Sequence, residues 1–152
     1  MPDSPQTSEA AGLDPAAARA VPRATARGAA RHVLLIEDDP RITSALAIRL
    51  TACGYRVSHA ADLDEAVGRV IDERPDVAVL DINLPDGNGL DLADRMRRLR
   101  ITVHLPLILI TASRDPRYRQ RAAEMDVPLI EKPFPAVDLI EAIERVTSAR
   151  AA

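Results

Sequence analysis

Short runs of aliphatic residues recur along this chain, and segments with helical spacing separate one run from the next. Four runs are plain in the sequence: Val33–Ile36, Val77–Leu80, Leu107–Ile110 and Leu129–Ile130. A continuous apolar run of this length, bounded by polar residues, is typical of a strand buried on both faces. Strands that alternate with helices favour a parallel sheet with right-handed crossover connections. This alternation constrains the fold more than any other feature of the sequence.

The alternation predicts five strand–helix units from His32 onward. A further short strand is expected at Tyr55–Ala60, and the helices are expected over 40–53, Leu63–Glu73, Leu90–Leu99, Pro116–Met125 and from Pro135 to the end. Gly54 ends the first helix, and Pro85 to Gly89 is expected to form a turn-rich loop. Five such units predict an α/β fold of the flavodoxin-like type, with strand order 2-1-3-4-5 and helices on both faces.

Composition narrows the classes of protein. The chain has 152 residues, 47% of them hydrophobic but only 2% aromatic, so one aliphatic core is expected. A net charge of −3 argues against a direct nucleic-acid partner. The single Cys53 excludes an internal disulfide, and no apolar run reaches the roughly 20 residues that span a bilayer. A cytoplasmic domain with no membrane contact is therefore expected.

The first 30 residues differ in character from the rest. They are rich in alanine, proline and arginine and contain almost no bulky apolar side chains. Such a segment buries too little surface to offset its ordering entropy, so a disordered tail is expected over 1–30. It is expected to be inert, although a docking arm stays open as an alternative. The folded domain is expected over 31–149, with no output domain after it.

Polar residues follow four of the expected strands, at the point where each strand ends. Glu37 and Asp38 follow the first strand, Asp81 the third, Thr111 the fourth and Lys132 the fifth. Because the carboxyl ends of parallel strands meet at one edge of the sheet, these side chains are expected to converge there. The convergence would place three carboxylates, one hydroxyl and one ammonium group in one site.

A divalent cation is expected at this site. Two carboxylates about 4 Å apart repel by about 4 kcal/mol at an effective dielectric constant near 20, and a bound cation removes that cost. Hard oxygen ligands favour Mg²⁺, or Mn²⁺ in its place. The expected direct ligands are Asp38, Asp81 and the backbone carbonyl of Asn83, with Glu37 in the outer shell through water.

Asp81 is expected to accept a phosphoryl group. It ends the central strand beside the expected cation, and a carboxylate so placed can attack phosphorus. Lys132 would neutralise charge on the incoming oxygens, while the Thr111 hydroxyl and the Ala112 backbone N–H would hydrogen-bond to them. The product would be an acyl phosphate, which water can hydrolyse, so it suits a timed signal.

Residues 32 to about 148 resemble the receiver domain of two-component response regulators. The resemblance rests on four motifs at the strand ends: Glu37-Asp38-Asp39-Pro40, Asp81-Ile82-Asn83-Leu84-Pro85-Asp86-Gly87-Asn88-Gly89, Thr111-Ala112 and Lys132-Pro133-Phe134. It implies that Asp81 receives phosphate from a phosphohistidine on a sensor histidine kinase or a histidine phosphotransfer protein. It also implies a cis bond before Pro133, an unknown downstream protein target or onward relay, and no enzyme activity beyond self-phosphorylation and self-dephosphorylation.

Two positions depart from the family pattern. Leu129 stands where the family usually has a tyrosine or phenylalanine, three residues before the lysine. The stretch Met125–Pro128 lacks the family's Gly-Ala pair and is about one residue shorter. The resemblance therefore predicts intact phosphorylation chemistry but leaves open how the phosphorylated state is read.

Two other functions stay open at this point. One is a magnesium-dependent phosphohydrolase with an aspartyl nucleophile, disfavoured because Asn83 stands where such enzymes usually have a second carboxylate. The other is a degenerate receiver that acts only in docking or dimerisation. The arginines in and around the third and fourth helices are expected to form a solvated face or, alternatively, a docking surface for an acidic partner.

Overall fold

The computed structural model of this chain describes residues 31–84 and 87–151. The expected disordered tail at 1–30 lies outside the described residues, as do Pro85 and Asp86 at the centre of the expected turn. The described residues include all four strand ends at which the candidate site residues are expected.

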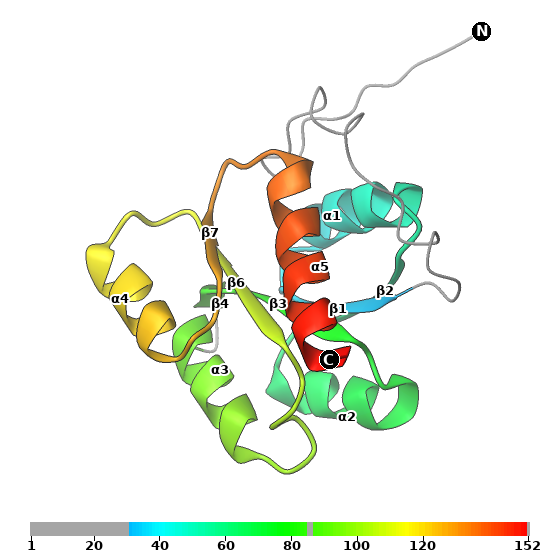
Figure 1. The fold of residues 1–152 in the computed structure, drawn as a ribbon, viewed down its shortest axis with the longest axis horizontal. Helices are drawn as coiled ribbons and strands as arrows, with labels where there is room; N and C mark the ends of the chain where they lie inside the picture. The colour runs from blue at the N-terminus through cyan, green and yellow to red at the C-terminus, as the bar shows by residue number, and fades with distance from the viewer. Residues whose placement is uncertain (1–30, 85–86, 152) are drawn as a thin grey trace, which may run out of the picture.

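One parallel sheet of five strands forms the centre of the molecule, with the order β2-β1-β3-β6-β7 (Figure 1). Its strands are β1 (His32–Ile36), β2 (Arg56–Ala60), β3 (Val77–Asp81), β6 (Leu107–Thr111) and β7 (Leu129–Glu131). Numbered within this sheet alone, the order is 2-1-3-4-5, which confirms the expected flavodoxin-like topology. All residues of β1, β3 and β6 are buried, as expected for strands with helices on both faces.

Five helices connect and cover the strands: α1 (Pro40–Ala52), α2 (Leu63–Glu73), α3 (Gly89–Arg98), α4 (Pro116–Glu124) and α5 (Ala136–Ala151). Asp39, Asp62, Asn88 and Asp115 accept backbone N–H bonds at the starts of the first four, as N-cap residues do. Several predicted boundaries were wrong by one residue, because capping geometry decides where a helix starts or stops and hydrophobic spacing does not fix it. The third helix starts at Gly89, one residue earlier than predicted. The fifth helix starts at Ala136, one residue later than predicted.

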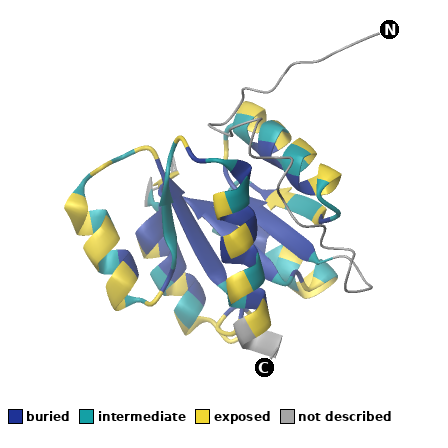
Figure 2. Ribbon diagram, turned by 45° about the horizontal axis from the view of Figure 1, so that its top comes forward, coloured by how far each residue is buried: buried dark blue, intermediate teal, exposed yellow. Residues whose placement is uncertain are grey.

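Two apolar clusters fill the spaces on the two sides of the sheet. One contains side chains from α1 and α5 together with Val33, Val79 and Ile108. The other contains side chains from α2, α3 and α4 together with Leu34 and Leu80. Adjacent strand residues thus point to opposite clusters, as the pleat requires, and Figure 2 shows the buried strands between partly exposed helices. The three central strands β1, β3 and β6 are therefore packed on both faces.

A short antiparallel pair, which the sequence pattern did not predict, lies directly after β3. It joins β4 (Asn83–Leu84) to β5 (Gly87–Asn88) on either side of the residues that are not described. Immediately after it, the backbone N–H of Gly89 donates to the Ile82 carbonyl at 2.6 Å. The segment after β3 is therefore folded back against the strand end that carries Asp81.

None of the helices in the described ranges is both long enough and apolar enough to cross a membrane.

Candidate functional site

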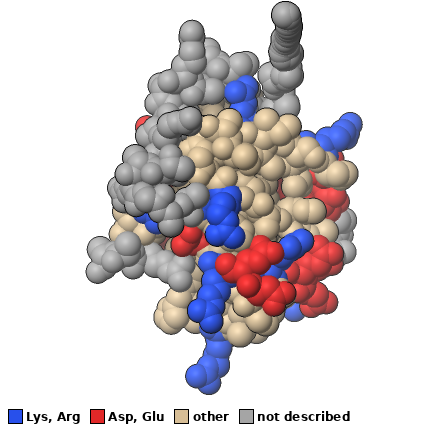
Figure 3. Space-filling model, turned by 90° about the vertical axis from the view of Figure 1, so that its right-hand side faces the viewer, with Lys and Arg blue, Asp and Glu red and all other residues tan. Residues whose placement is uncertain are grey.

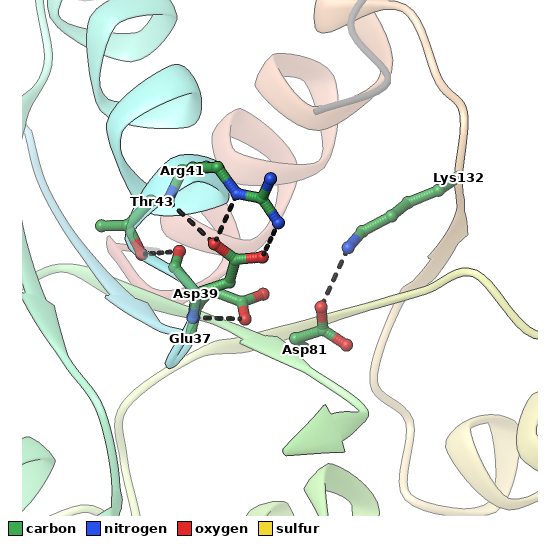
Figure 4. Close-up of polar contacts among 6 residues, drawn as sticks. All are labelled: Glu37, Asp39, Arg41, Thr43, Asp81 and Lys132. Carbon is green, nitrogen blue, oxygen red and sulfur yellow. Dashed lines mark hydrogen bonds and ion pairs between the residues drawn. The ribbon is translucent and has the colours of Figure 1, made fainter. Parts of the chain in front are cut away.

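Asp81 and Lys132 meet at the carboxyl edge of the sheet. Asp81 is the last residue of β3 and only 5% exposed. Its Oδ2 accepts a hydrogen bond from Lys132 Nζ at 2.9 Å, and its Oδ1 accepts one from the Asn83 backbone N–H at 2.8 Å. Lys132 directly follows β7, so residues 51 positions apart form this ion pair (Figure 4). Both carboxylate oxygens of Asp81 therefore have donors, which orient the side chain.

Glu37 lies beside this pair at the end of β1. It is 4% exposed; its Oε2 accepts from the Asp39 backbone N–H at 3.1 Å. Its Oε1 is buried with no hydrogen-bond partner among the described residues. Burial, and then the neighbouring Asp81 carboxyl group, raise the pKa of Glu37 to about 8. Two acidic groups therefore lie close together, and Lys132 is the one cation among the described residues that pairs with Asp81 (Figure 4).

The two aspartates after Glu37 have different surroundings. Asp38 is exposed, and its side chain makes no hydrogen bond or ion pair within the described part of the chain. Asp39 caps α1 by accepting from the Arg41 backbone N–H at 2.9 Å, and it forms an exposed ion pair with Arg41. That hydrogen bond lowers the pKa of Asp39. Asp39 therefore serves the helix start, while Asp38 is free to face an added ligand.

Thr111 stands at the neighbouring strand end. It is fully buried, and its hydroxyl oxygen accepts from the Ser113 backbone N–H at 3.0 Å. Its carbonyl accepts from the Lys132 backbone N–H at 2.8 Å, which ties the end of β6 to the residue after β7. Ala112 is exposed at the start of the following loop. The threonine and the lysine are thus held at adjacent positions along one edge.

Lys132 is positioned by the residues around it. The Lys132–Pro133 peptide bond is cis. Phe134, two residues later, is 2% exposed and packs into the cluster with α1 and α5. Leu129 pairs with Leu109 in the sheet and is only partly buried, packed against the opposite cluster. The lysine therefore stands between an anchored aromatic ring and a strand.

The donor set fits a hydrated cation better than an enclosed one. Within 31–84 and 87–151, no group of three or more His, Cys, Asp or Glu side chains is arranged to hold a metal ion. Glu37 nevertheless offers a buried, unpartnered oxygen next to Asp81. Mg²⁺ keeps several waters and needs only one or two carboxylates. The residues present therefore fit magnesium bound at an open edge.

For two residues that shape this edge, the sequence predicted a turn and a family motif but not the contacts that they make. A Cβ atom on Gly89 would lie 2.4 Å from the Asp81 carbonyl oxygen, so only glycine fits there. Asn88 holds the start of α3 by accepting from the Leu90 backbone N–H at 2.6 Å. The Asn-Gly pair signals a turn, but a local pattern does not reveal which distant backbone the glycine approaches.

Comparison with known proteins identifies the family. Residues 33–144 match the family described as the response regulator receiver domain. The chain is 30% identical over 117 residues to the phosphate regulon transcriptional regulatory protein PhoB of Pseudomonas aeruginosa, covering 76% of this chain and 51% of that protein. It is 45% identical over 83 residues to the transcriptional regulatory protein AfsQ1 of Streptomyces coelicolor, covering 55% of this chain and 36% of that protein. The chain thus spans about half the length, or less, of these curated relatives.

Solved structures agree with this result. The non-phosphorylated HemR receiver domain from Leptospira biflexa superimposes with a TM-score of 0.66 at 35% identity, covering 78% of this chain and 94% of that one. A CheY-like receiver domain from Methanospirillum hungatei superimposes with a TM-score of 0.70 at 25% identity, covering 80% and 97%. The match to the family covers the five strands of the sheet, except the first residue of β1, and every strand end described above. The chain belongs to the response regulator receiver domain family of two-component signalling.

Proposed function

We propose that this chain accepts a phosphoryl group on Asp81 from a phosphohistidine and passes the signal on by protein contact or by onward relay. The observation that carries the proposal is the ion pair between Lys132 Nζ and Asp81 Oδ2 at 2.9 Å, beside the buried Glu37. A carboxylate held this way at the end of a rigid strand can be esterified with little movement of the backbone. Neither the phosphohydrolase alternative nor the docking-only alternative is favoured by the family match.

The side chains take separate roles in the transfer. An Asp81 oxygen forms the new bond to phosphorus while the bond from phosphorus to the donor's histidine nitrogen breaks. The Lys132 ammonium group then leaves the Asp81 carboxylate and pairs with a phosphoryl oxygen. The Thr111 hydroxyl and the Ala112 backbone N–H donate to the other oxygens. Because Thr111 now accepts from the Ser113 N–H, its own proton is available for such a bond.

Magnesium fits the same edge. The residues that would hold it are Asp38, Asp81 and the backbone carbonyl of Asn83, with Glu37 acting through a water molecule. When bound, the ion supplies positive charge that offsets the crowded carboxylates and the incoming phosphoryl oxygens. Asp38 is suited to the role because it is exposed and has no other partner in the described chain.

The partners follow from this chemistry. The donor is a sensor histidine kinase or a histidine phosphotransfer protein, and the exchange takes place in the cytoplasm. PhoB and AfsQ1 are transcriptional regulators of about twice the matched length or more. The output proposed for this chain is a contact with a separate protein, and its net charge of −3 argues against direct binding to nucleic acid.

The first test is phosphorylation by a small donor. Incubation of the chain with acetyl phosphate and Mg²⁺ should add the mass of one phosphoryl group, and chelation of the metal should prevent it. Asp81→Asn should remove the labelling, whereas Asp72→Asn, an exposed carboxylate on α2, should keep it. Labelling of Asp81→Asn at the wild-type level would refute the assignment.

The second test separates acceptance from readout. Lys132→Ala should still gain the phosphoryl mass, because the lysine is not the nucleophile. Its amide NMR signals along β7 and α4 should shift much less on phosphorylation, because the ion pair that links β7 to Asp81 is gone. Full wild-type shifts in this variant would show that the lysine does not couple the two.

A further inference from the structure

The loop between α3 and β6 lies at the end of the sheet opposite the carboxyl end of β3 (Figure 1), and it exposes aliphatic side chains. Leu99 is 38% exposed, Ile101 50% and Val103 38%. They are three of the five large hydrophobic side chains that are exposed in the described residues. Scattered single exposures are ordinary, but three within five residues form a local patch.

The loop holds these side chains in a fixed arrangement. Thr102, between Ile101 and Val103, is fully buried, and its hydroxyl donates to the Met96 carbonyl at 2.6 Å. The Thr102 backbone N–H donates to the Leu99 carbonyl at 3.1 Å. Because the central residue is anchored inward, the residues on either side of it are directed outward. A patch ordered before binding loses little conformational entropy when a partner docks.

Unpaired positive charge surrounds the same loop. Arg100 lies within it, and Arg95 lies one helical turn before Leu99, on the same face. Both are exposed, and neither forms an ion pair with another described residue. By contrast, each of the three arginines of α4 pairs with a carboxylate. Two cations without partners next to three exposed aliphatic side chains favour an acidic ligand with an apolar face.

We propose that Arg95, Leu99, Arg100, Ile101 and Val103, here called the α3–β6 loop patch, dock an acidic protein segment that carries aliphatic side chains. The aliphatic side chains would be buried on docking, and each guanidinium matches a carboxylate with two parallel hydrogen bonds. This surface is remote from Asp81, so the inference goes beyond the proposed phosphoacceptor function.

Two other occupants fit the patch less well. A membrane surface favours a long amphipathic helix rich in basic residues, whereas this patch is a short loop with two arginines and no aromatic residue; the chain's net charge of −3 also opposes anionic lipid. A second copy would have to offer an acidic face. Figure 3 shows acidic side chains gathered on the side that carries α2, whose acidic residues are Asp64, Glu65, Asp72 and Glu73. Self-association through α2 is therefore the competing outcome.

The test uses three defined probes with the unphosphorylated full chain. The first is a helical peptide of glutamate and leucine, the second replaces leucine with serine, and the third replaces glutamate with lysine. Amide NMR titration should shift the signals of residues 95–104 with the first peptide, and both replacements should weaken binding about tenfold or more. Vesicles of phosphatidylcholine and phosphatidylglycerol form a fourth arm and should give no shift.

Substitutions test whether the first peptide binds at the α3–β6 loop patch. Arg100→Glu and Ile101→Ser should each raise the Kd of the first peptide about tenfold, because one removes the charge match and the other the buried contact. Ile48→Ser is the matched control, since Ile48 is 69% exposed on α1 and lies outside the patch. All three positions are exposed, so the fold should be retained. Shifts centred elsewhere, unchanged affinity in the patch variants, binding to vesicles, or dimerisation that Asp72→Asn abolishes would each overturn the proposal.

Discussion

The two ends of β1 carry buried titratable groups in opposite circumstances. His32 opens the strand and Glu37 follows its last residue, and each is 4% exposed. Each also has one buried side-chain atom with no hydrogen-bond partner among the described residues, His32 Nδ1 and Glu37 Oε1. Burial lowers the pKa of His32 and raises the pKa of Glu37 to about 8, because it disfavours the charged form of both.

The groups around His32 differ from those around Glu37. The His32 Nε2 atom lies 2.9 Å from Ser58 Oγ and 3.4 Å from Glu73 Oε1, and its backbone N–H donates to Asp76 at 2.7 Å. These groups fasten β1 to β2 and to the segment before β3. Glu37 instead faces Asp81, a group of its own kind. The contacts at the amino end of β1 therefore stabilise the fold, whereas at the carboxyl end two acidic groups are held close together, and a bound cation can relieve their repulsion.

The largest expected effect concerns how tightly the carboxyl end is packed. In Gly89→Ala the new Cβ would lie 2.4 Å from the Asp81 carbonyl oxygen, so the backbone must move. The free energy of unfolding should fall by about 2–3 kcal/mol, measured by urea denaturation. The same variant should accept phosphate from acetyl phosphate more slowly, because the strand end that carries Asp81 is displaced.

Gly68 provides the matched control away from that edge. It lies within α2, and a Cβ added there would meet nothing within 4 Å. Gly68→Ala should therefore raise the free energy of unfolding by about 0.5–1 kcal/mol through helix propensity. If both variants changed stability equally, the carboxyl end would not be the tightly packed region that the structure describes.

A smaller effect on stability should come from the burial of the Glu37 carboxyl group beside Asp81. The Glu37 carboxyl has a pKa near 4.5 when unfolded and about 8 when folded. The stability it contributes is fully present below pH 4.5 and is lost as the pH rises to 8. Relaxation of this open edge and entry of water offset most of the cost of this shift, so Glu37→Gln should unfold with a free energy about 1–2 kcal/mol higher than wild type at pH 8.5 in metal-free buffer.

The neighbouring aspartate is the control for Glu37. Asp38→Asn removes an exposed carboxylate one residue away and should change the free energy of unfolding by less than about 0.5 kcal/mol at pH 8.5. Both measurements use urea denaturation at pH 5.5 and pH 8.5. A gain for Glu37→Gln that is the same at both pH values would show that ionisation of this carboxyl does not destabilise the fold.

The differences between the two ends of β1 show which features the sequence alone could predict. The order of the sheet and the meeting of Asp81 with Lys132 at one edge were predictable, because strand periodicity and parallel topology fix which ends converge. Periodicity did not predict the different positions and contacts of Glu37, Asp38 and Asp39. Which of three consecutive acids turns inward depends on how the chain leaves the strand to begin α1. The approach of Gly89 to the Asp81 carbonyl likewise depends on packing between distant segments.

The contacts at the amino end of β1 were even less predictable from the sequence. Local sequence does not predict the role of His32, because its partners come from β2, α2 and the segment before β3. The exposed aliphatic loop after α3 has no periodic pattern, and its outward side chains result from the burial of Thr102. Local sequence therefore predicts where polar residues gather at strand ends, but not which of them find partners.

The smallest effect should appear at the amino end and with the opposite sign. Because the folded pKa of His32 lies below 6.5, its contribution to stability is present above pH 6.5 and is lost as the pH falls. His32→Gln cannot take up this proton, so its free energy of unfolding should fall less than that of wild type between pH 7 and pH 5. The Arg56 guanidinium works with burial, whereas Glu73 and Asp76 oppose it, which keeps the effect small. His59→Gln, at an exposed position of β2, should follow the wild-type curve. If His32→Gln became less stable than wild type on acidification, the two ends of β1 would not be opposed as the structure indicates.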